Sequence, residues 1–120
     1  MEASKKCHIC VNSQGTNLRF KVNDLILLYS NGRLQHYYVY RSGSTAKVEL
    51  ISVAKKLKNL EDYFDHTFYD LREGWHFNLN FYKSHTGYSV KTTIEEKAEL
   101  LPDLIVSRAR LKGFNDALKK

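Results

Sequence analysis

The chain has 120 residues, of which 42% are hydrophobic and 27% charged, a composition that fits a folded domain and excludes a wholly disordered segment. Its formal net charge of +6 favours a polyanionic partner, nucleic acid first and an anionic membrane second. No apolar run approaches the ~20 residues needed to span a bilayer, no signal peptide is visible and only two cysteines are present, so we expect a cytoplasmic protein without membrane contact.

The N-terminal half predicts strands. We expect residues 1–6 to be disordered and residues 7–120 to form one domain. Alternating or apolar stretches predict strands at residues 7–11, 18–22, 25–29, 34–41 and 47–50. Leu25–Tyr29 is a continuous apolar run, which suits a strand buried on both faces, and Ser30-Asn31-Gly32 predicts the turn after it.

A central helix is predicted next. Ser52 can serve as an N-cap, and apolar residues then recur at helical spacing to about Phe64: Val53, Leu57, Leu60 and Phe64. The pattern therefore predicts a helix over residues 52–64, after which residues 65–69 form a link.

The stretch Asp70–Tyr82 reads DLREGWHFNLNFY and organises the C-terminal half. A charged run ends at Gly74, and an alternating strand follows over residues 75–82, so we expect a polar loop held out by a rigid sheet. A strand follows at residues 88–94, residues 94–101 fit a strand or a helix, and residues 104–106 form a short strand. Ser107 can cap a C-terminal helix. The predicted fold is mainly β with one central and one C-terminal helix.

This order of elements resembles the LytTR DNA-binding domain, the output module of bacterial response regulators of the LytR/AgrA/AlgR type. The similar segments are DLILLYSNGR, SVAKKLKNLEDYF, the Asp70–Tyr82 stretch and VSRARLKGF, which together cover about residues 7–118. Two motifs are the most specific: the family's R-h-H-R-S-Y-h-h-N-L (h, apolar) falls on Asp70–Leu79, and its h-S-R falls on Val106–Arg108.

The resemblance implies an elongated, antiparallel β fold that inserts loops into successive major grooves of double-stranded DNA. It also implies binding in pairs to direct-repeat promoter sites. Three places would contact DNA: the loop after the first long apolar strand, the polar part of the central motif, and the Ser-Arg before the last helix. They correspond here to Arg33, Gln35 and His36, to Arg72 and Glu73, and to Arg108.

The central motif departs from the family pattern in its polar half. Asp70, Arg72, Glu73 and Gly74 stand where the family has Arg, His, Arg and Ser, whereas Asn78-Leu79 is retained. A carboxylate such as that of Glu73 can accept a hydrogen bond from cytosine N4 but repels phosphates. The scaffold half of the motif is thus kept, while the contact half differs.

Each candidate contact has a structural alternative. Arg108 can bind guanine or phosphate, or be an exposed helix arginine. Arg72 can face DNA or form an ion pair with Asp70 or Glu73, and Glu73 can orient an arginine. The Arg33–His36 segment can read bases or be a solvated hairpin tip.

Metal binding and catalysis have little support in the sequence. Cys7 and Cys10 stand three residues apart, but no second such pair completes a zinc site, so we expect strand packing and no metal. No nucleophile elbow, phosphate loop or paired carboxylates appear, so we expect neither an enzyme nor a cofactor. The hypothesis is a sequence-specific duplex DNA-binding domain of a transcription regulator in a two-component system. The alternative is a β-rich module that binds protein or single-stranded RNA through a Tyr and Phe surface.

Overall fold

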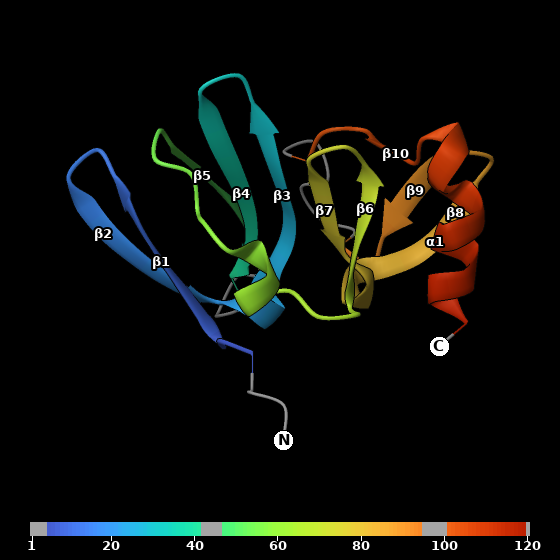
Figure 1. The fold of residues 1–120 in the computed structure, drawn as a ribbon, viewed down its shortest axis with the longest axis horizontal. Coiled ribbons are helices and arrows are strands. Elements are labelled where there is room, and N and C mark those ends of the chain that lie inside the picture. Colours follow the sequence, from blue (N-terminus) through green and yellow to red (C-terminus); the bar gives the residue numbers. More distant parts are fainter. Residues whose placement is uncertain (1–4, 42–46, 95–100, 120) are drawn as a thin grey trace.

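The fold of the chain is given by a computed structural model that describes residues 5–41, 47–94 and 101–119. Within these ranges the chain forms ten strands, short 3-10 turns and one α-helix (Figure 1). The elements are β1 (His8–Ser13), β2 (Thr16–Lys21), β3 (Leu25–Asn31), β4 (Leu34–Arg41), β5 (Lys47–Val53), β6 (Phe68–Arg72), β7 (Trp75–Asn78), β8 (Tyr82–Thr86), β9 (Ser89–Thr92), β10 (Leu104–Ile105) and α1 (Leu111–Leu118).

A five-stranded antiparallel sheet in the order β5-β4-β3-β7-β6 forms the middle of the molecule. Its central strand, β3, is apolar and buried from Leu25 to Leu28, which confirms the prediction of a strand covered on both faces. Leu25 and Leu28 belong to one core cluster, and Ile26 and Leu27 belong to a second. The sheet therefore separates two hydrophobic cores.

The first core lies under the N-terminal ribbon. Strands β1 and β2 pair with each other and place Ile9 and Phe20 against Tyr37 and Ile51 of the central sheet. The Ser13 hydroxyl also donates to the Ser52 carbonyl at 3.1 Å, so the turn end of the ribbon is fixed near the end of β5.

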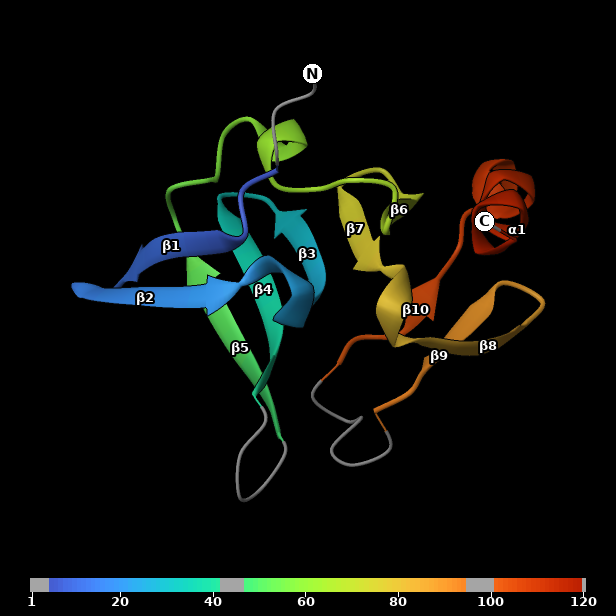
Figure 2. The ribbon, with the colours of Figure 1, turned by 90° about the horizontal axis from the view of Figure 1, so that it is seen from below.

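The second core joins the sheet to the C-terminal elements. Strands β8, β9 and β10 form a three-stranded sheet, and α1 buries Phe114 in the same cluster as Leu71 and Phe77. Figure 2 shows this layer beside the central sheet, with α1 at the far end from the ribbon. Gly113 brings the helix against β6, because a Cβ at this position would overlap the Tyr69 hydroxyl. The C-terminal helix is confirmed.

The predicted central helix over residues 52–64 is wrong. Strand β5 continues to Val53, and the chain then runs without regular structure to a 3-10 turn at Leu60–Asp62. Ile51 and Val53 are buried in the sheet, and Asn59 has a left-handed backbone with φ of 56° that an α-helix does not accept. The fold is therefore mainly antiparallel β with a single C-terminal helix among the described residues.

The predicted strand over residues 75–82 is divided in two. Strand β7 ends at Asn78, a 3-10 turn covers Leu79–Phe81, and Tyr82 begins β8 in the other sheet. The buried Asn78 amide fixes this change of sheet, because its Nδ2 donates to the Leu25 carbonyl at 2.9 Å and its Oδ1 accepts from the Asn80 N–H at 3.0 Å.

Three further expectations concern the shape and the ends of segments. The molecule measures 41 × 40 × 31 Å, so it is flattened and not markedly elongated. Residues 1–4 of the predicted disordered segment lie outside the described residues, as do residues 95–100 of the ambiguous 94–101 stretch. Residues 5 and 6 of the same predicted segment are described, and the Lys6 backbone N–H donates to the Asp62 carbonyl at 2.8 Å.

Candidate nucleic-acid interface

The turn between β3 and β4 carries the first candidate residues. Gly32 has φ of 61°, a left-handed conformation that favours glycine, and it closes a two-residue loop with Arg33. The Arg33 side chain is exposed and contacts no hydrogen-bonding or charged partner within the described residues. The neighbouring Leu34 is 42% exposed. The turn thus presents a cation beside an apolar side chain.

Gln35 does not lie on the surface, contrary to its prediction as a base-reading residue. Its side chain is 3% exposed, and its Oε1 accepts hydrogen bonds from the Tyr37 hydroxyl and the Leu57 N–H, each at 2.7 Å. The cause is strand alternation, which puts Gln35 on the same buried face as Tyr37 and Val39. Burial raises the pKa of the Tyr37 hydroxyl well above its ordinary value, so Tyr37 remains a neutral donor.

His36 is half-buried and faces the other side of β4. Its Nδ1 lies 2.7 Å from the Ser52 hydroxyl, and its ring centroid lies 4.9 Å from that of Tyr29. The predicted Arg33–His36 set is therefore divided: Arg33 is presented to solvent, Gln35 is buried and His36 packs beneath the turn.

The turn between β6 and β7 carries the second pair of candidates. Arg72 and Glu73 are exposed, and Gly74 closes the turn with φ of 79°. The Arg72 guanidinium carbon lies 4.2 Å from the centroid of the Trp75 ring, and it forms no ion pair with Asp70 or Glu73. Trp75 in turn stacks on Tyr29, with centroids 4.3 Å apart and planes 14° apart. Arg72 is thus held on an aromatic platform.

That platform links the two turns. The Trp75–Tyr29 stack joins the start of β7 to the end of β3, and the Tyr29 ring also contacts the His36 ring. A continuous row of side chains therefore runs from the β6–β7 turn to the β3–β4 turn at one end of the central sheet.

The connection from β10 to α1 carries the third candidate. Its path is fixed where the Ser107 N–H donates to the Leu71 carbonyl at 2.8 Å, which places Arg108 beside the end of β6. Ser107 has an extended backbone and makes no side-chain capping bond, so the 3-10 turn Arg108–Arg110 precedes α1 without the predicted cap. Arg108 is exposed and has no ion-pair partner within the described part of the chain.

The three turns lie along one edge of the molecule, which we call the turn edge; it comprises Gly32–Leu34, Arg72–Gly74 and Ser107–Arg108. Figure 1 shows it as the upper margin, spread along the longest axis. Its exposed charges are three arginines and one carboxylate, that of Glu73. An edge of this kind is suited to a polyanion, because its cations face outward without internal counter-charges.

An ionic cluster behind the turn edge was not predicted. Asp70 Oδ1 lies 2.5 Å from His76 Nδ1, and Asp70 Oδ2 lies 3.6 Å from Arg110 Nη1. The Tyr69 hydroxyl donates to the Arg110 carbonyl at 2.8 Å. Burial alone would raise the pKa of Asp70, but the hydrogen bond and charge of His76, with the charge of Arg110, hold it below its ordinary value.

The sequence did contain a signal for this cluster. Asp70 and His76 are cross-strand partners once Glu73-Gly74 is recognised as a hairpin turn. Arg110 could not be found in the same way, because its approach depends on how α1 packs on β6.

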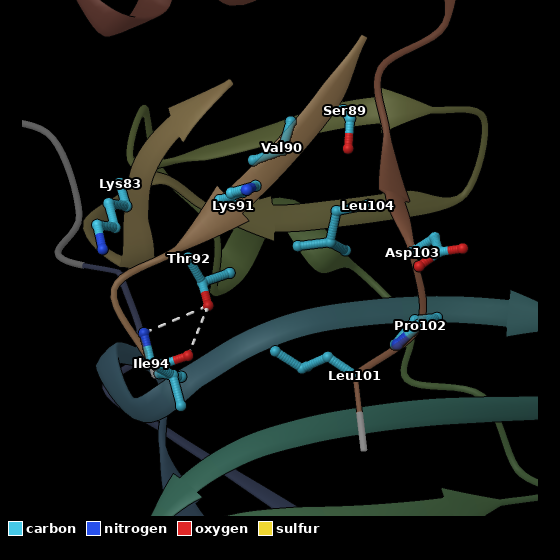
Figure 3. A pocket seen from close by; sticks show the side chains of 10 residues that line it. All are labelled: Lys83, Ser89, Val90, Lys91, Thr92, Ile94, Leu101, Pro102, Asp103 and Leu104. Atoms are coloured by element: carbon cyan, nitrogen blue, oxygen red, sulfur yellow. Dashed lines mark hydrogen bonds between the residues drawn. The ribbon is translucent and has the colours of Figure 1, made fainter. Parts of the chain in front are cut away.

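The described residues form no cluster of side chains that could hold a metal ion. Residues 5–41, 47–94 and 101–119 contain no convergence of three His, Cys, Asp or Glu side chains, and Cys7 and Cys10 are both exposed free thiols. A cavity of about 520 Å³ lies between β9 and residues 101–104 (Figure 3). Asp103 is the single carboxylate among its described lining residues, which include no histidine or cysteine. No helix in the described ranges is long and apolar enough to cross a membrane.

Comparison with known proteins bears on the fold. No protein-family model matches the chain, and no curated protein sequence matches it. Among solved structures, one described as the LytTr DNA-binding domain of a methyl-accepting/DNA response regulator from Bacillus cereus superposes with a TM-score of 0.64. The match covers 96% of this chain and 99% of that one at 11% sequence identity. The resemblance seen in the sequence is thereby confirmed at the level of structure: this chain has the LytTR fold.

Proposed function

We propose that this chain is a sequence-specific, double-stranded DNA-binding domain that serves as the output module of a bacterial transcription regulator in the cytoplasm. The observation that carries the proposal is the turn edge, where segments distant in sequence each present an exposed arginine that forms no ion pair with a described residue. The LytTR fold and the DNA-binding description of the Bacillus cereus structure support it.

The arginines have the chemistry that reading a major groove requires. A guanidinium can donate two parallel hydrogen bonds to guanine O6 and N7, or bind a phosphate. The Arg72 guanidinium lies over the Trp75 ring and forms no hydrogen bond with a described residue, so its N–H groups are free to donate. Leu34 can contact a thymine methyl group, and Glu73 can accept from cytosine N4. The proposed contact set is therefore Arg33, Leu34, Arg72, Glu73 and Arg108.

Gln35 and His36 have supporting roles in this proposal. Gln35 is committed to Tyr37 and Leu57, and His36 packs under the turn against Tyr29. Neither is proposed to touch a base.

The dimensions of the molecule are compatible with contact to successive major grooves. The turn edge runs in the direction of the longest axis, along which the whole molecule, with the β1–β2 ribbon at one end, measures 41 Å, and one turn of B-DNA advances ~34 Å. Two copies on direct repeats one helical turn apart would then lie on the same face of the duplex.

The alternative function, binding of protein or single-stranded RNA through an aromatic surface, gains no support. Tyr37 and Tyr38 are 0% and 5% exposed, so the cluster of tyrosines on β4 does not form such a surface. Trp75 and Tyr29 are half-buried and stack on each other.

Titration of salt tests the proposal. We expect labelled duplexes from a random pool to bind, with log affinity falling against log salt at a slope near −5. The reason is that about six phosphate contacts each release bound counterions and each contribute about −0.9 to the slope. A single-stranded RNA of equal length is the control and should bind more weakly. A slope near zero, or no binding to any duplex, would contradict the proposal.

A further inference from the structure

A basic cavity lies beside the turn edge, between the β1–β2 ribbon and the segment that follows β5. Its volume is about 520 Å³. Four lysines line it against one carboxylate, that of Asp62; they are Lys6, Lys55, Lys56 and Lys58. Part of the remaining lining is amide side chains, whose N–H groups can also donate hydrogen bonds to an anion. The cavity therefore has the charge and the donors of an anion site.

The segment that carries three of these lysines is fixed by the protein. The Leu57 N–H donates to the buried Gln35 Oε1, and Asn59 turns the chain with a left-handed backbone. On the other side of the cavity, the backbone N–H of Lys6 donates to the Asp62 carbonyl and its ammonium lies 5.4 Å from the centre of the Tyr63 ring. The lysines are thus attached to an anchored rim.

The charges on this segment are not neutralised internally. Lys55, Lys56 and Lys58 are exposed and form no ion pair or hydrogen bond to any residue in the described ranges. Lysines on a loop are commonly just solvated, but here three of them line one hollow and repel one another. An anion bound in the cavity would relieve that repulsion.

The lysine segment of the cavity begins near the β3–β4 turn of the turn edge. Val53, at the start of the lysine segment, pairs with Gln35, two residues from the exposed Arg33. The ribbon joins at the same place, where the Ser13 hydroxyl donates to the Ser52 carbonyl. An extended polyanion that contacts Arg33 can therefore continue over the lysines.

We propose that this cavity binds backbone phosphates of the same duplex, outside the bases that the three turns read. This inference rests on the proposed DNA-binding function and deepens it by adding a contact site between the ribbon and the β5 segment. Lysines fit this task because an ammonium acts as a point charge that positions the backbone without reading sequence.

The test compares two triple variants of equal charge change in the full chain. Lys55, Lys56 and Lys58 are changed to Gln in one variant, and Lys21, Lys91 and Lys119, which are exposed and do not line the cavity, are changed to Gln in the control. Duplex affinity is measured against salt for both and for the unmodified protein. Loss of three phosphate contacts should make the slope shallower by about 2.7, because each contact contributes about 0.9. The control should keep the original slope.

Further outcomes separate the possible explanations. A second cavity variant changes the same three lysines to Arg, which keeps the charges, and should keep the slope. That result would show that substitution at these positions does not by itself disrupt the fold. If the unmodified protein binds duplex with a steep slope and both Gln variants match it, the inference alone is overturned. If the unmodified protein binds no duplex, the proposed function itself fails. Tight binding of inorganic phosphate without DNA, with an unchanged slope in the cavity variant, would also overturn the inference by showing a site for free phosphate.

Discussion

At the scale of single residues, the turn edge is supported from behind by buried and half-buried side chains. Gln35 is the clearest case, because one buried amide oxygen accepts from both the Tyr37 hydroxyl and the Leu57 N–H. It therefore connects the strand that leads into the β3–β4 turn with the segment that carries the lysines. Trp75 has a similar place under Arg72, where it limits the directions that the guanidinium can take.

Changing Gln35 to Ala should lower the free energy of unfolding by about 1–3 kcal/mol, because two buried donors lose their acceptor. The matched control is Gln14→Ala, at the chain's other glutamine, which is exposed and without a hydrogen-bond partner within the described residues. Urea unfolding of both variants measures the difference. Equal stability of the two would show that the Gln35 amide does not stabilise the fold.

At the scale of elements, one ionic cluster joins β6, β7 and the 3-10 turn before α1. Asp70 binds His76 across the β6–β7 hairpin and faces Arg110 of the turn that begins at Arg108. The cluster thus ties two of the three segments of the turn edge to each other. Because Asp70 is held below its ordinary pKa by these partners, its contribution to stability depends on pH.

The sign of that dependence follows from the lowered pKa. The stabilisation by Asp70 is fully present above the carboxyl's unfolded pKa of about 4 and is lost as the pH falls through the lower folded value. Asp70→Asn should therefore be less stable than the unmodified protein near pH 7, and the gap should narrow below about pH 4. Urea unfolding at several pH values measures it, with Asp116→Asn, at an exposed position, as the control. A gap that stays constant down to pH 3 would argue against the cluster.

At the scale of the whole molecule, the sequence predicted the sheet well and the connections less well. The bounds of β4 were predicted at residues 34–41, and the buried run of β3 was recognised, because long apolar or aromatic stretches ended at a glycine turn. The prediction of a helix over residues 52–64 was wrong. The leucine spacing fits an amphipathic helix, but pairing in the sheet and the Gln35–Leu57 hydrogen bond determine the path of the chain. That bond joins residues 22 positions apart, and local patterns do not reveal it.

The exposure of the candidate residues was predicted in part for the same reason. Arg33, Arg72, Glu73 and Arg108 lie exposed on turns, as their neighbouring glycines or the start of a helical segment indicated. The burial of the Gln35 side chain depends on which face of β4 meets the N-terminal ribbon. The alternation of residues along the strand does not by itself show which face that is. The lysine cavity forms between two segments about forty residues apart in the sequence, so no local sequence motif predicts it.

The central claim is that the turn edge reads bases in the major groove, and methylation interference at guanine N7 tests it most directly. Duplexes selected from a random pool by the unmodified protein are methylated lightly, and bound and free fractions are compared. We predict that methylation of particular guanines blocks binding, because it removes an acceptor of the arginine donors. Arg108→Ala should become indifferent to one of those guanines, whereas Arg19→Ala, at an exposed position on β2, should keep the full pattern. Selected duplexes that bind equally well with and without N7 methylation would contradict the account.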